Sequence, residues 1–82
     1  MTMWGAKRAI NSTNGGHLAI MAKSTDWYTR LMVAGNPHSR PKTLMDLIRD
    51  RSECYEEVAG NPSTPMDVLV YMIEHPQLIK TN

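Results

Sequence analysis

The segment Val33-Ala34-Gly35-Asn36-Pro37 occurs a second time in the chain as Val58-Ala59-Gly60-Asn61-Pro62. An exact repeat of this length is unexpected by chance in a sequence of 82 residues. The spacing of the two copies is typical of helical repeat proteins, in which each repeat buries its apolar face against the next one. The repeat therefore predicts a stack of helical turns rather than a conventional closed core.

Each copy of the segment carries a signal for the end of a helix. Glycine adopts the left-handed conformation at a helix C-terminus without a Cβ penalty, so we expect a positive φ at Gly35 and at Gly60. A residue that precedes proline is pushed out of the helical region, which applies to Asn36. Both glycines are therefore expected to mark helix ends.

Apolar residues at three- and four-residue steps predict helices around these two stops, and no segment is predicted to be a strand. The helical pattern begins at His17, and the next helix starts near Pro41, because proline suits a first helical position. The last helix opens at Thr64-Pro65, where Thr64 is expected to cap and Asp67 to complete a capping box. The residues expected in the core are Leu31, Val33, Leu44, Leu47, Ile48, Cys54, Val58, Leu69, Met72 and Ile73.

The chain is predicted to form one domain preceded by a short arm. Residues 11–16 are turn formers without an apolar period, so residues 1–16 are expected to be a flexible N-terminal arm, with Trp4 free to dock on an apolar surface. Residues 17–82 are expected to form the helical domain. A domain this small buries only roughly 60–65% of the surface of its unfolded chain, so a partner or a second copy could supply further burial.

The repeat unit resembles the leucine-rich repeat variant, a family of bacterial helical repeats. The match is close at Asn61-Pro62-Ser63-Thr64-Pro65 with the apolar residues of 68–73, and looser at 36–41 with 44–48, where one extra residue precedes the second proline. The resemblance covers about residues 17–80 as two units and a degenerate first one. It implies an all-α fold, a short right-handed helical-repeat solenoid of about five helices, and it is nearly silent on function.

The whole chain also resembles the cytoplasmic antiholins of T-even bacteriophages, in its length, its Met-rich beginning and its lack of catalytic motifs. Antiholins of this kind bind the cytoplasmic part of a holin and delay lysis. The resemblance implies a small inhibitor that sequesters a cytoplasmic segment of a membrane protein.

Charge divides the chain into two unlike halves. Residues 1–49 contain seven Lys or Arg against two Asp, a balance of +5, and residues 50–82 contain two against six Asp or Glu, a balance of −4. The two charged regions could attract each other as solvated faces. Alternatively, one of them could be a docking surface of a single sign.

The sequence contains no pattern that predicts catalysis, a metal site or a cofactor. The single cysteine, Cys54, lies on an apolar stripe, and no histidine is close enough in sequence to activate it. His17, His38 and His75 lack the tight spacing of metal ligands. Gly15-Gly16 is not followed by the Lys-Ser/Thr pair of a phosphate-binding loop. We therefore expect a protein that is not an enzyme.

The sequence also favours a soluble cytoplasmic protein. One cysteine cannot form an internal disulfide, which agrees with a reducing compartment. The segment 1–8 lacks the apolar run of a signal peptide. No segment approaches the ~20 apolar residues that a membrane span needs.

Protein binding without catalysis is the function that the sequence favours. A short acidic helix lies between the two helix stops, and we expect it to project from the domain. Its Tyr55 is predicted to anchor a partner, because a tyrosine can bury its ring and keep its hydroxyl in water. The predicted partner-binding residues are Tyr55, Glu53, Glu56, Glu57 and Asp50, with Trp27 and Arg30 as a second candidate face.

Nucleic-acid binding is the alternative function. It would use Trp27 or Tyr28 for base stacking and a set of basic residues for the backbone, namely Arg30, Arg40, Lys42, Arg49 and Arg51. The sequence pI of about 7.9 is below the value above ~9 that marks such domains, and the C-terminal acids would repel phosphate. Protein binding is therefore the better interpretation.

Overall fold

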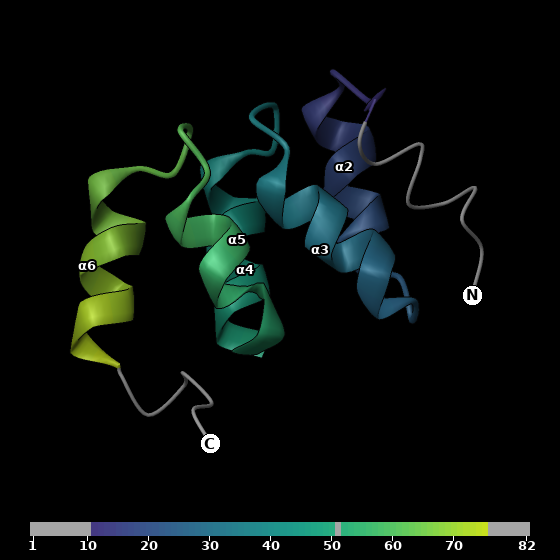
Figure 1. The fold of residues 1–82 in the computed structure, drawn as a ribbon. Coiled ribbons are helices and arrows are strands. Elements are labelled where there is room, and N and C mark those ends of the chain that lie inside the picture. Colours follow the sequence, from purple (N-terminus) through teal and green to yellow (C-terminus); the bar gives the residue numbers. More distant parts are fainter. Residues whose placement is uncertain (1–10, 51, 76–82) are drawn as a thin grey trace.

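All regular secondary structure in the described part of the chain is helical. The structure is a computed structural model that describes residues 11–50 and 52–75, so the predictions for Trp4 and Arg51 lie outside the described residues. No strand occurs in these two ranges, which confirms the all-α class (Figure 1). The elements are α2 (Gly15–Met21), α3 (Trp27–Gly35), α4 (Pro41–Asp50), η1 (Ser52–Cys54), α5 (Tyr55–Ala59) and α6 (Met66–Glu74).

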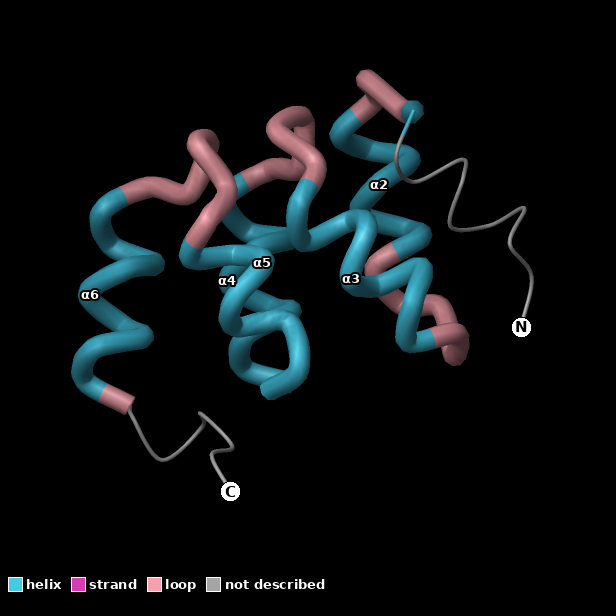
Figure 2. The backbone as a smooth tube through the Cα atoms, in the orientation of Figure 1, coloured by secondary structure: helices cyan, strands magenta, loops and turns pink. Residues whose placement is uncertain are grey.

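These elements recur with the period of the sequence. The start of α6 follows the start of α4 by the same number of residues that separates the two copies of the repeated segment. The start of η1 follows the start of α3 by the same number, and η1 runs directly into α5. Contacts join α3 to α5 and α4 to α6, so corresponding helices are neighbours. The loops before α4 and before α6 lie at the same edge of the molecule (Figure 2). The superhelical arrangement and its handedness stay a prediction.

A buried asparagine joins these two loops. The Asn61 side-chain amide donates to the carbonyl oxygens of Ala34, at 2.8 Å, and Asn36, at 3.0 Å. Its Oδ1 accepts the backbone N–H of Ser63 at 2.9 Å, which closes its own turn. The Ser63 hydroxyl adds a second bond between the loops, to the carbonyl oxygen of Pro37 at 2.5 Å. One side chain thus sets both the local turn and the distance between loops.

Asn36 makes the corresponding bonds one unit earlier. Its Nδ2 donates to the carbonyl oxygen of Ser12 at 2.9 Å, and its Oδ1 accepts the backbone N–H of His38 at 2.8 Å. Both asparagines are buried. The asparagine therefore has the same role in both units, because each copy ties its loop to the preceding segment.

The two repeated segments end helices as predicted, but without the predicted left-handed residue. Gly35 is the last residue of α3, and Gly60 follows α5 with φ −86° and ψ −4°. No described residue has a positive φ, so that prediction is wrong for both glycines. Asn36 has left the helical region, with φ −81° and ψ 123°, as expected before proline.

Hydroxyl groups add a second hydrogen bond to the carbonyl at each of these helix ends. The Ser39 hydroxyl donates to the carbonyl oxygen of Val33 at 2.6 Å, and Thr64 donates to Val58 at the same distance. The two donors hold equivalent positions in the two loops, shortly after the carbonyl that each satisfies. Each of these carbonyls also accepts a backbone N–H at 3.1 Å, from Asn36 and from Asn61 respectively, so both helix ends are paired without a left-handed residue.

The starts of two helices differ from the predictions. Helix α2 begins at Gly15 rather than His17, because Asn14 accepts the backbone N–H of His17 at 3.1 Å and caps it. The expected boundary after residue 16 therefore falls inside a helix. Helix α6 has Pro65 at its N-cap without a side-chain capping bond, since the Thr64 hydroxyl is committed to Val58. The predicted capping box is wrong, whereas the start of α4 at Pro41 is confirmed.

Most of the predicted core is buried. The buried apolar residues that were predicted are Val33, Leu44, Leu47, Ile48, Cys54, Val58 and Met72, and those that were not are Leu18, Ala34, Tyr55 and Val68. Leu31 and Leu69 are partly buried against this cluster. Ile73 is 76% exposed, so its assignment to the core is wrong. It has helical spacing, but it faces away from the preceding helices.

The asparagine bonds between loops make a stability prediction. Asn61→Asp keeps the acceptor for Ser63 but loses both donated bonds, so two buried carbonyl oxygens lose a partner. We expect a loss of ~1–3 kcal/mol in the free energy of unfolding, measured by urea denaturation. Ser63→Ala, which removes an exposed bond between the same loops, should cost less. A variant as stable as the parent would show that the asparagine amide does not hold the loops together.

The conformation of Gly60 makes an opposite prediction. A Cβ there would lie 3.5 Å from the carbonyl oxygen of Glu56, which is ordinary contact, and the backbone is right-handed. Gly60→Ala should therefore raise the free energy of unfolding by ~0.4–1 kcal/mol, because alanine reduces the entropy of the unfolded chain. A loss of stability in the same denaturation assay would indicate a left-handed residue at this position.

Candidate protein-binding surfaces

The seven residues predicted to bind a partner do not form one surface. Five are exposed, on four different elements: Trp27 on α3, Asp50 on α4, Glu53 on η1, and Glu56 and Glu57 on α5. The other two, Tyr55 and Arg30, are buried. The structure therefore separates the predicted site into an acidic surface, an exposed indole and two internal side chains.

Tyr55 belongs to the core and not to a docking surface. Its side chain is 4% exposed, and its hydroxyl donates to the carbonyl oxygen of His75 at 3.2 Å, just after α6. The short helix that it begins packs against α3 and α4 instead of projecting. Its predicted role as an accessible anchor is therefore wrong. Burial, and secondarily the nearby Tyr71, raises the pKa of the Tyr55 phenol above its usual value.

Arg30 is an internal link between elements. Its guanidinium donates to the carbonyl oxygen of Ser24 at 2.7 Å and to the Glu53 carboxylate at 2.9 Å. Only 6% of the residue is exposed, so the charge is unavailable to a partner on an open face. The bond to Glu53 holds the middle of α3 against η1. Arg30 therefore cannot serve the docking face that was predicted for it.

The repeat offers evidence in the sequence against the two incorrect predictions, those for Arg30 and Tyr55. Arg30 and Tyr55 stand one period apart, and so do Val33 and Val58, which are both fully buried. A position that is internal in one unit is expected to be internal in the next, since both pack against equivalent neighbours. Alignment of the units would thus have placed Arg30 and Tyr55 in equivalent environments, which argues against Tyr55 and Arg30 as parts of two different docking faces.

The acidic surface consists of Glu53, which lies on η1, and Glu56 and Glu57, which lie on α5. All three are exposed, and Glu53 is engaged by Arg30. No ion pair is recorded for Glu56 or Glu57 within the described part of the chain. Like charges on one short helix repel each other, so a cationic group that approaches them would relieve this repulsion. The acidic surface can attract a basic ligand.

Trp27 provides an exposed apolar group close to the acidic surface. It is 53% exposed at the start of α3, and its ring leans on Tyr28 with centroids 5.6 Å apart. Trp27 lies one helical turn before Arg30, which is bonded to Glu53. The Arg30–Glu53 pair therefore brings the start of α3 toward the acidic surface.

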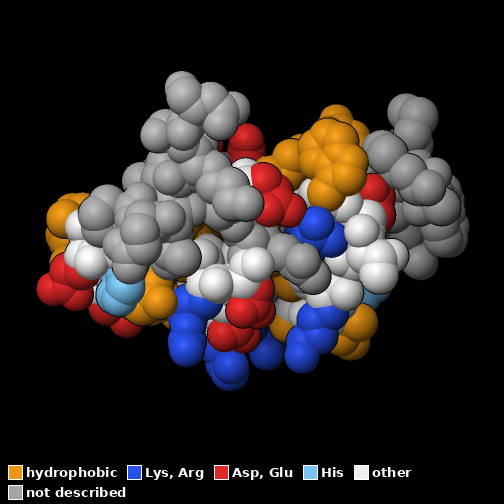
Figure 3. Space-filling view, turned by 90° about the horizontal axis from the view of Figure 1, so that it is seen from below, with side chains coloured by type: hydrophobic (Ala, Val, Ile, Leu, Met, Phe, Trp, Pro, Cys, Tyr) orange, Lys and Arg blue, Asp and Glu red, His pale blue; other side chains and the backbone are white. Residues whose placement is uncertain are grey.

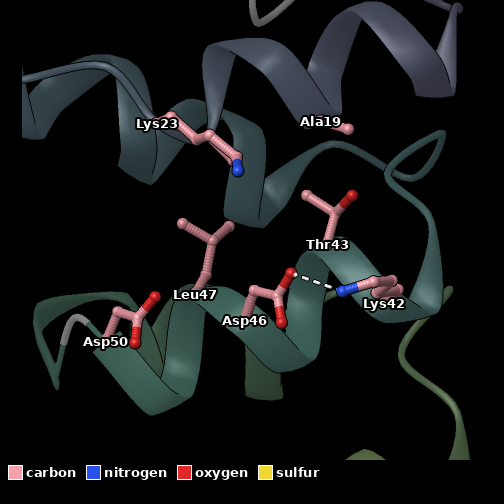
Figure 4. A pocket seen from close by; sticks show the side chains of 8 residues that line it. Ala19, Lys23, Lys42, Thr43, Asp46, Leu47 and Asp50 are labelled. Carbon is pink, nitrogen blue, oxygen red and sulfur yellow. Dashed lines mark hydrogen bonds and ion pairs between the residues drawn. The ribbon is translucent and has the colours of Figure 1, made fainter.

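A groove that the sequence patterns did not predict lies between α2 and α4 (Figure 4). It encloses about 470 Å³. Figure 4 shows Lys23 on the α2 side and Asp46 and Asp50 on α4, with Lys42 paired to Asp46 at 3.2 Å. The lining residues are Ala19, Ala22, Lys23, Lys42, Thr43, Asp46, Leu47 and Asp50. Charges of both signs line it, so it does not select an anion or a cation.

Small side chains on α2 explain the groove. When α2 and α4 are aligned at their first residues, Ala19 and Ala22 correspond to Met45 and Ile48. On α4, Ile48 is fully buried and Met45 packs against the core. Where α2 meets α4, two alanines leave part of the space between the helices open. Asp50 lines this groove, whereas the other predicted acids lie on η1 and α5.

Three of the basic residues predicted to contact a nucleic-acid backbone are exposed, whereas Arg30 is buried. Arg40, Lys42 and Arg49 are exposed on or beside α4, and Figure 3 shows Lys and Arg side chains gathered along one edge of the molecule. Trp27 lies at the start of α3, and Arg40 follows the loop at its other end, so the helix separates them by ~12 Å. Arg40 therefore lies beyond the far end of α3 from Trp27, and nucleic-acid binding stays a prediction.

The described residues contain no group of three or more side chains that could hold a metal ion. None of the helices in residues 11–50 and 52–75 is long and apolar enough to cross a bilayer. Comparison with protein-family models, with curated proteins and with solved structures finds no match to this chain.

The buried phenol of Tyr55 makes a prediction about alkaline pH. Because its pKa is raised in the folded state, the unfolded chain loses this proton first, and stability falls as pH rises through about 10 and beyond. Tyr55→Phe should be less stable at neutral pH, having lost the bond to His75, but its melting temperature should fall less steeply between about pH 9 and 11. Tyr28→Phe, outside the buried core, is the control and should follow the parent. Parallel curves for the parent and Tyr55→Phe would contradict the assignment.

Proposed function

We propose that this chain is a non-catalytic protein-binding module of the leucine-rich-repeat-variant kind, with its helices stacked as a short right-handed solenoid. In this proposal it works in the cytoplasm as a small inhibitor of the antiholin type. Its target is the cytoplasmic segment of a holin, and binding delays lysis. The observation that carries the proposal is the acidic surface of Glu53, Glu56 and Glu57.

The charge of this surface supports a basic target segment. Cytoplasmic segments that flank membrane spans carry an excess of Lys and Arg. Glu56 and Glu57 are exposed, and no ion pair with a described residue is recorded for them, so they can pair with such a segment. Opposite charges at the rim of an interface mainly accelerate association. The acidic surface therefore accounts for encounter with the target.

The exposed Trp27 supports an apolar contact that would hold the complex together after encounter. Half-exposed indoles are frequent hot spots, because they bury a large ring at a small cost in side-chain entropy. Trp27 replaces the buried Tyr55 as the candidate anchor, since the Arg30–Glu53 bond joins its helix to η1. Charge and apolar contact would then act on neighbouring parts of one interface.

The repeat supports the architectural part of the proposal. Helix starts recur with the period of the sequence, and the bonds of Asn36 and Asn61 recur with them. A row of corresponding helices offers ridges and shallow grooves suited to another protein's helix. Such a surface binds by shape and charge and requires no chemistry of its own.

The proposal can be tested with the cytoplasmic segment of a T-even holin, made as a synthetic peptide and immobilised for surface plasmon resonance. The parent should bind, and Glu56→Lys should lower the association rate ~10-fold at low ionic strength, with a smaller effect at high salt. Asp67→Lys makes the same charge change on α6 and should retain the parent's association rate.

Two outcomes would contradict the proposal in different ways. A parent protein that does not bind the peptide would refute the holin segment as the target. Binding that is equally fast in the parent and in Glu56→Lys would place the interface away from the acidic surface. Nanomolar binding to a single-stranded oligonucleotide at physiological salt would instead support the nucleic-acid function.

A further inference from the structure

The groove between α2 and α4 contains a polar side chain that the fold leaves without a partner. Thr43 lines the groove and is 5% exposed, and no hydrogen bond of its hydroxyl is recorded within the described part of the chain. Figure 4 shows its side chain pointing from α4 toward Ala19 on α2. A hydroxyl that is withdrawn from water costs free energy unless it forms a hydrogen bond. A ligand in the groove would supply this bond.

The repeat indicates that the Thr43 hydroxyl is not needed for packing. Thr43 stands one period before Val68 on α6, which is also buried and has nearly the same shape. Valine therefore satisfies the corresponding position in the next unit. Threonine adds only the hydroxyl, which makes no recorded bond inside the described protein. Binding of something outside the fold accounts for this group better than packing does.

One charge of each sign is left over among the residues that line the groove. Lys42 and Asp46 pair with each other at 3.2 Å, whereas no ion pair is recorded for Lys23 or Asp50 within the described residues. Figure 4 shows Lys23 on the α2 side and Asp50 on α4, with the Leu47 side chain between them. A groove with one available cation and one available carboxylate favours a ligand that carries both charges.

The lining also selects among such zwitterions. The groove volume of about 470 Å³ falls within the range of small-molecule pockets, about 300–1,000 Å³. None of its described lining residues is aromatic, so a quaternary ammonium group would lack its usual partner. The single lysine Lys23 balances a carboxylate, whereas the higher charge of a phosphate would need more cations. A primary ammonium and a carboxylate on one carbon match the pair, and they form the head group of a free α-amino acid.

The position of Thr43 defines the side chain of this ligand. Thr43 and Asp50 are two turns apart on α4, ~10 Å along its axis. The apolar residues Leu47, Ala19 and Ala22 line the groove and suit methylene groups. The Thr43 hydroxyl can then bond to an amide or hydroxyl at the end of the side chain. The groove therefore fits a linear side chain that ends in an uncharged polar group.

We propose that the groove between α2 and α4 binds a free α-amino acid whose side chain ends in an uncharged polar group, as glutamine does. Lys23 binds its carboxylate, Asp50 its ammonium group and Thr43 the end of its side chain. The acidic surface of the proposed function lies on η1 and α5, so the two binding sites are independent. A ligand held between α2 and α4 stabilises their contact, because it binds the folded chain alone.

Titration of the isotope-labelled full chain with L-glutamine, followed by heteronuclear NMR spectra, tests the proposal. The amides of Ala19, Lys23, Thr43 and Asp50 should show saturable shifts with a dissociation constant below ~1 mM. N-acetylglutamine and glutamine α-amide each lack one of the two charges and should bind at least ~10-fold more weakly. Leucine keeps both charges but lacks the polar end, so it should bind roughly 3- to 10-fold more weakly.

Variants of the polar residues separate binding from folding. Asp50→Asn and Lys23→Gln should each weaken glutamine binding at least ~10-fold, whereas Glu74→Gln, which removes a carboxylate from α6, should bind like the parent. Thr43→Val should bind glutamine no better than leucine. Its melting temperature should equal or exceed that of the parent, because it removes a hydroxyl without a partner.

Filling the groove gives a further test. Ale19 is not changed in charge: Ala19→Met places on α2 the residue that α4 carries at the corresponding position, Met45, and should abolish binding without lowering the melting temperature. A parent that shows no saturable shift up to ~10 mM glutamine overturns the proposal. Derivatives that bind as well as glutamine, leucine that binds equally well, or shifts that persist in Ala19→Met overturn it too.

Discussion

The arrangement of the helices depends on the side-chain amide of a buried asparagine in each loop. Asn61 reaches back to two carbonyl oxygens in and just before the preceding loop, and Asn36 does the same to Ser12. An unpaired buried carbonyl is costly, so each bond sets the separation between neighbouring loops and, with it, between the helices that they join. The period of the repeat is the number of residues between one such asparagine and the next.

Local signals in the sequence were sufficient for the helix class, the two helix stops and the start at Pro41. They failed where the partner of a group lies several residues away. Left-handed glycines were expected from the usual capping pattern, whereas each helix-end carbonyl here accepts a backbone N–H from a right-handed turn together with the hydroxyl of Ser39 or Thr64. Because the Thr64 hydroxyl donates to Val58, it does not cap α6. Ile73 was misplaced because periodicity identifies an apolar side without showing whether another helix covers it.

The candidate site shows the same division between local and longer-range information. Exposure of Glu56 and Glu57 follows from their place on the outer side of a short helix, and the sequence was sufficient to predict it. The interior positions of Arg30 and Tyr55 depend on partners 23 and 20 residues away, and only a comparison of the two units would have indicated them. The groove is lined by two alanines, and only an alignment of α2 with α4 shows that larger residues stand at the corresponding positions.

The bonds between loops also determine how the domain opens. Each asparagine joins a loop to its immediate predecessor, so α4 is supported from both sides, whereas α2 and α6 each have a free side in the described residues. In proteins built of nearest-neighbour contacts, opening spreads inward from the ends. Amide protons of α4 are therefore expected to exchange with deuterium most slowly, while those of α6 exchange through fraying that leaves the remaining helices intact.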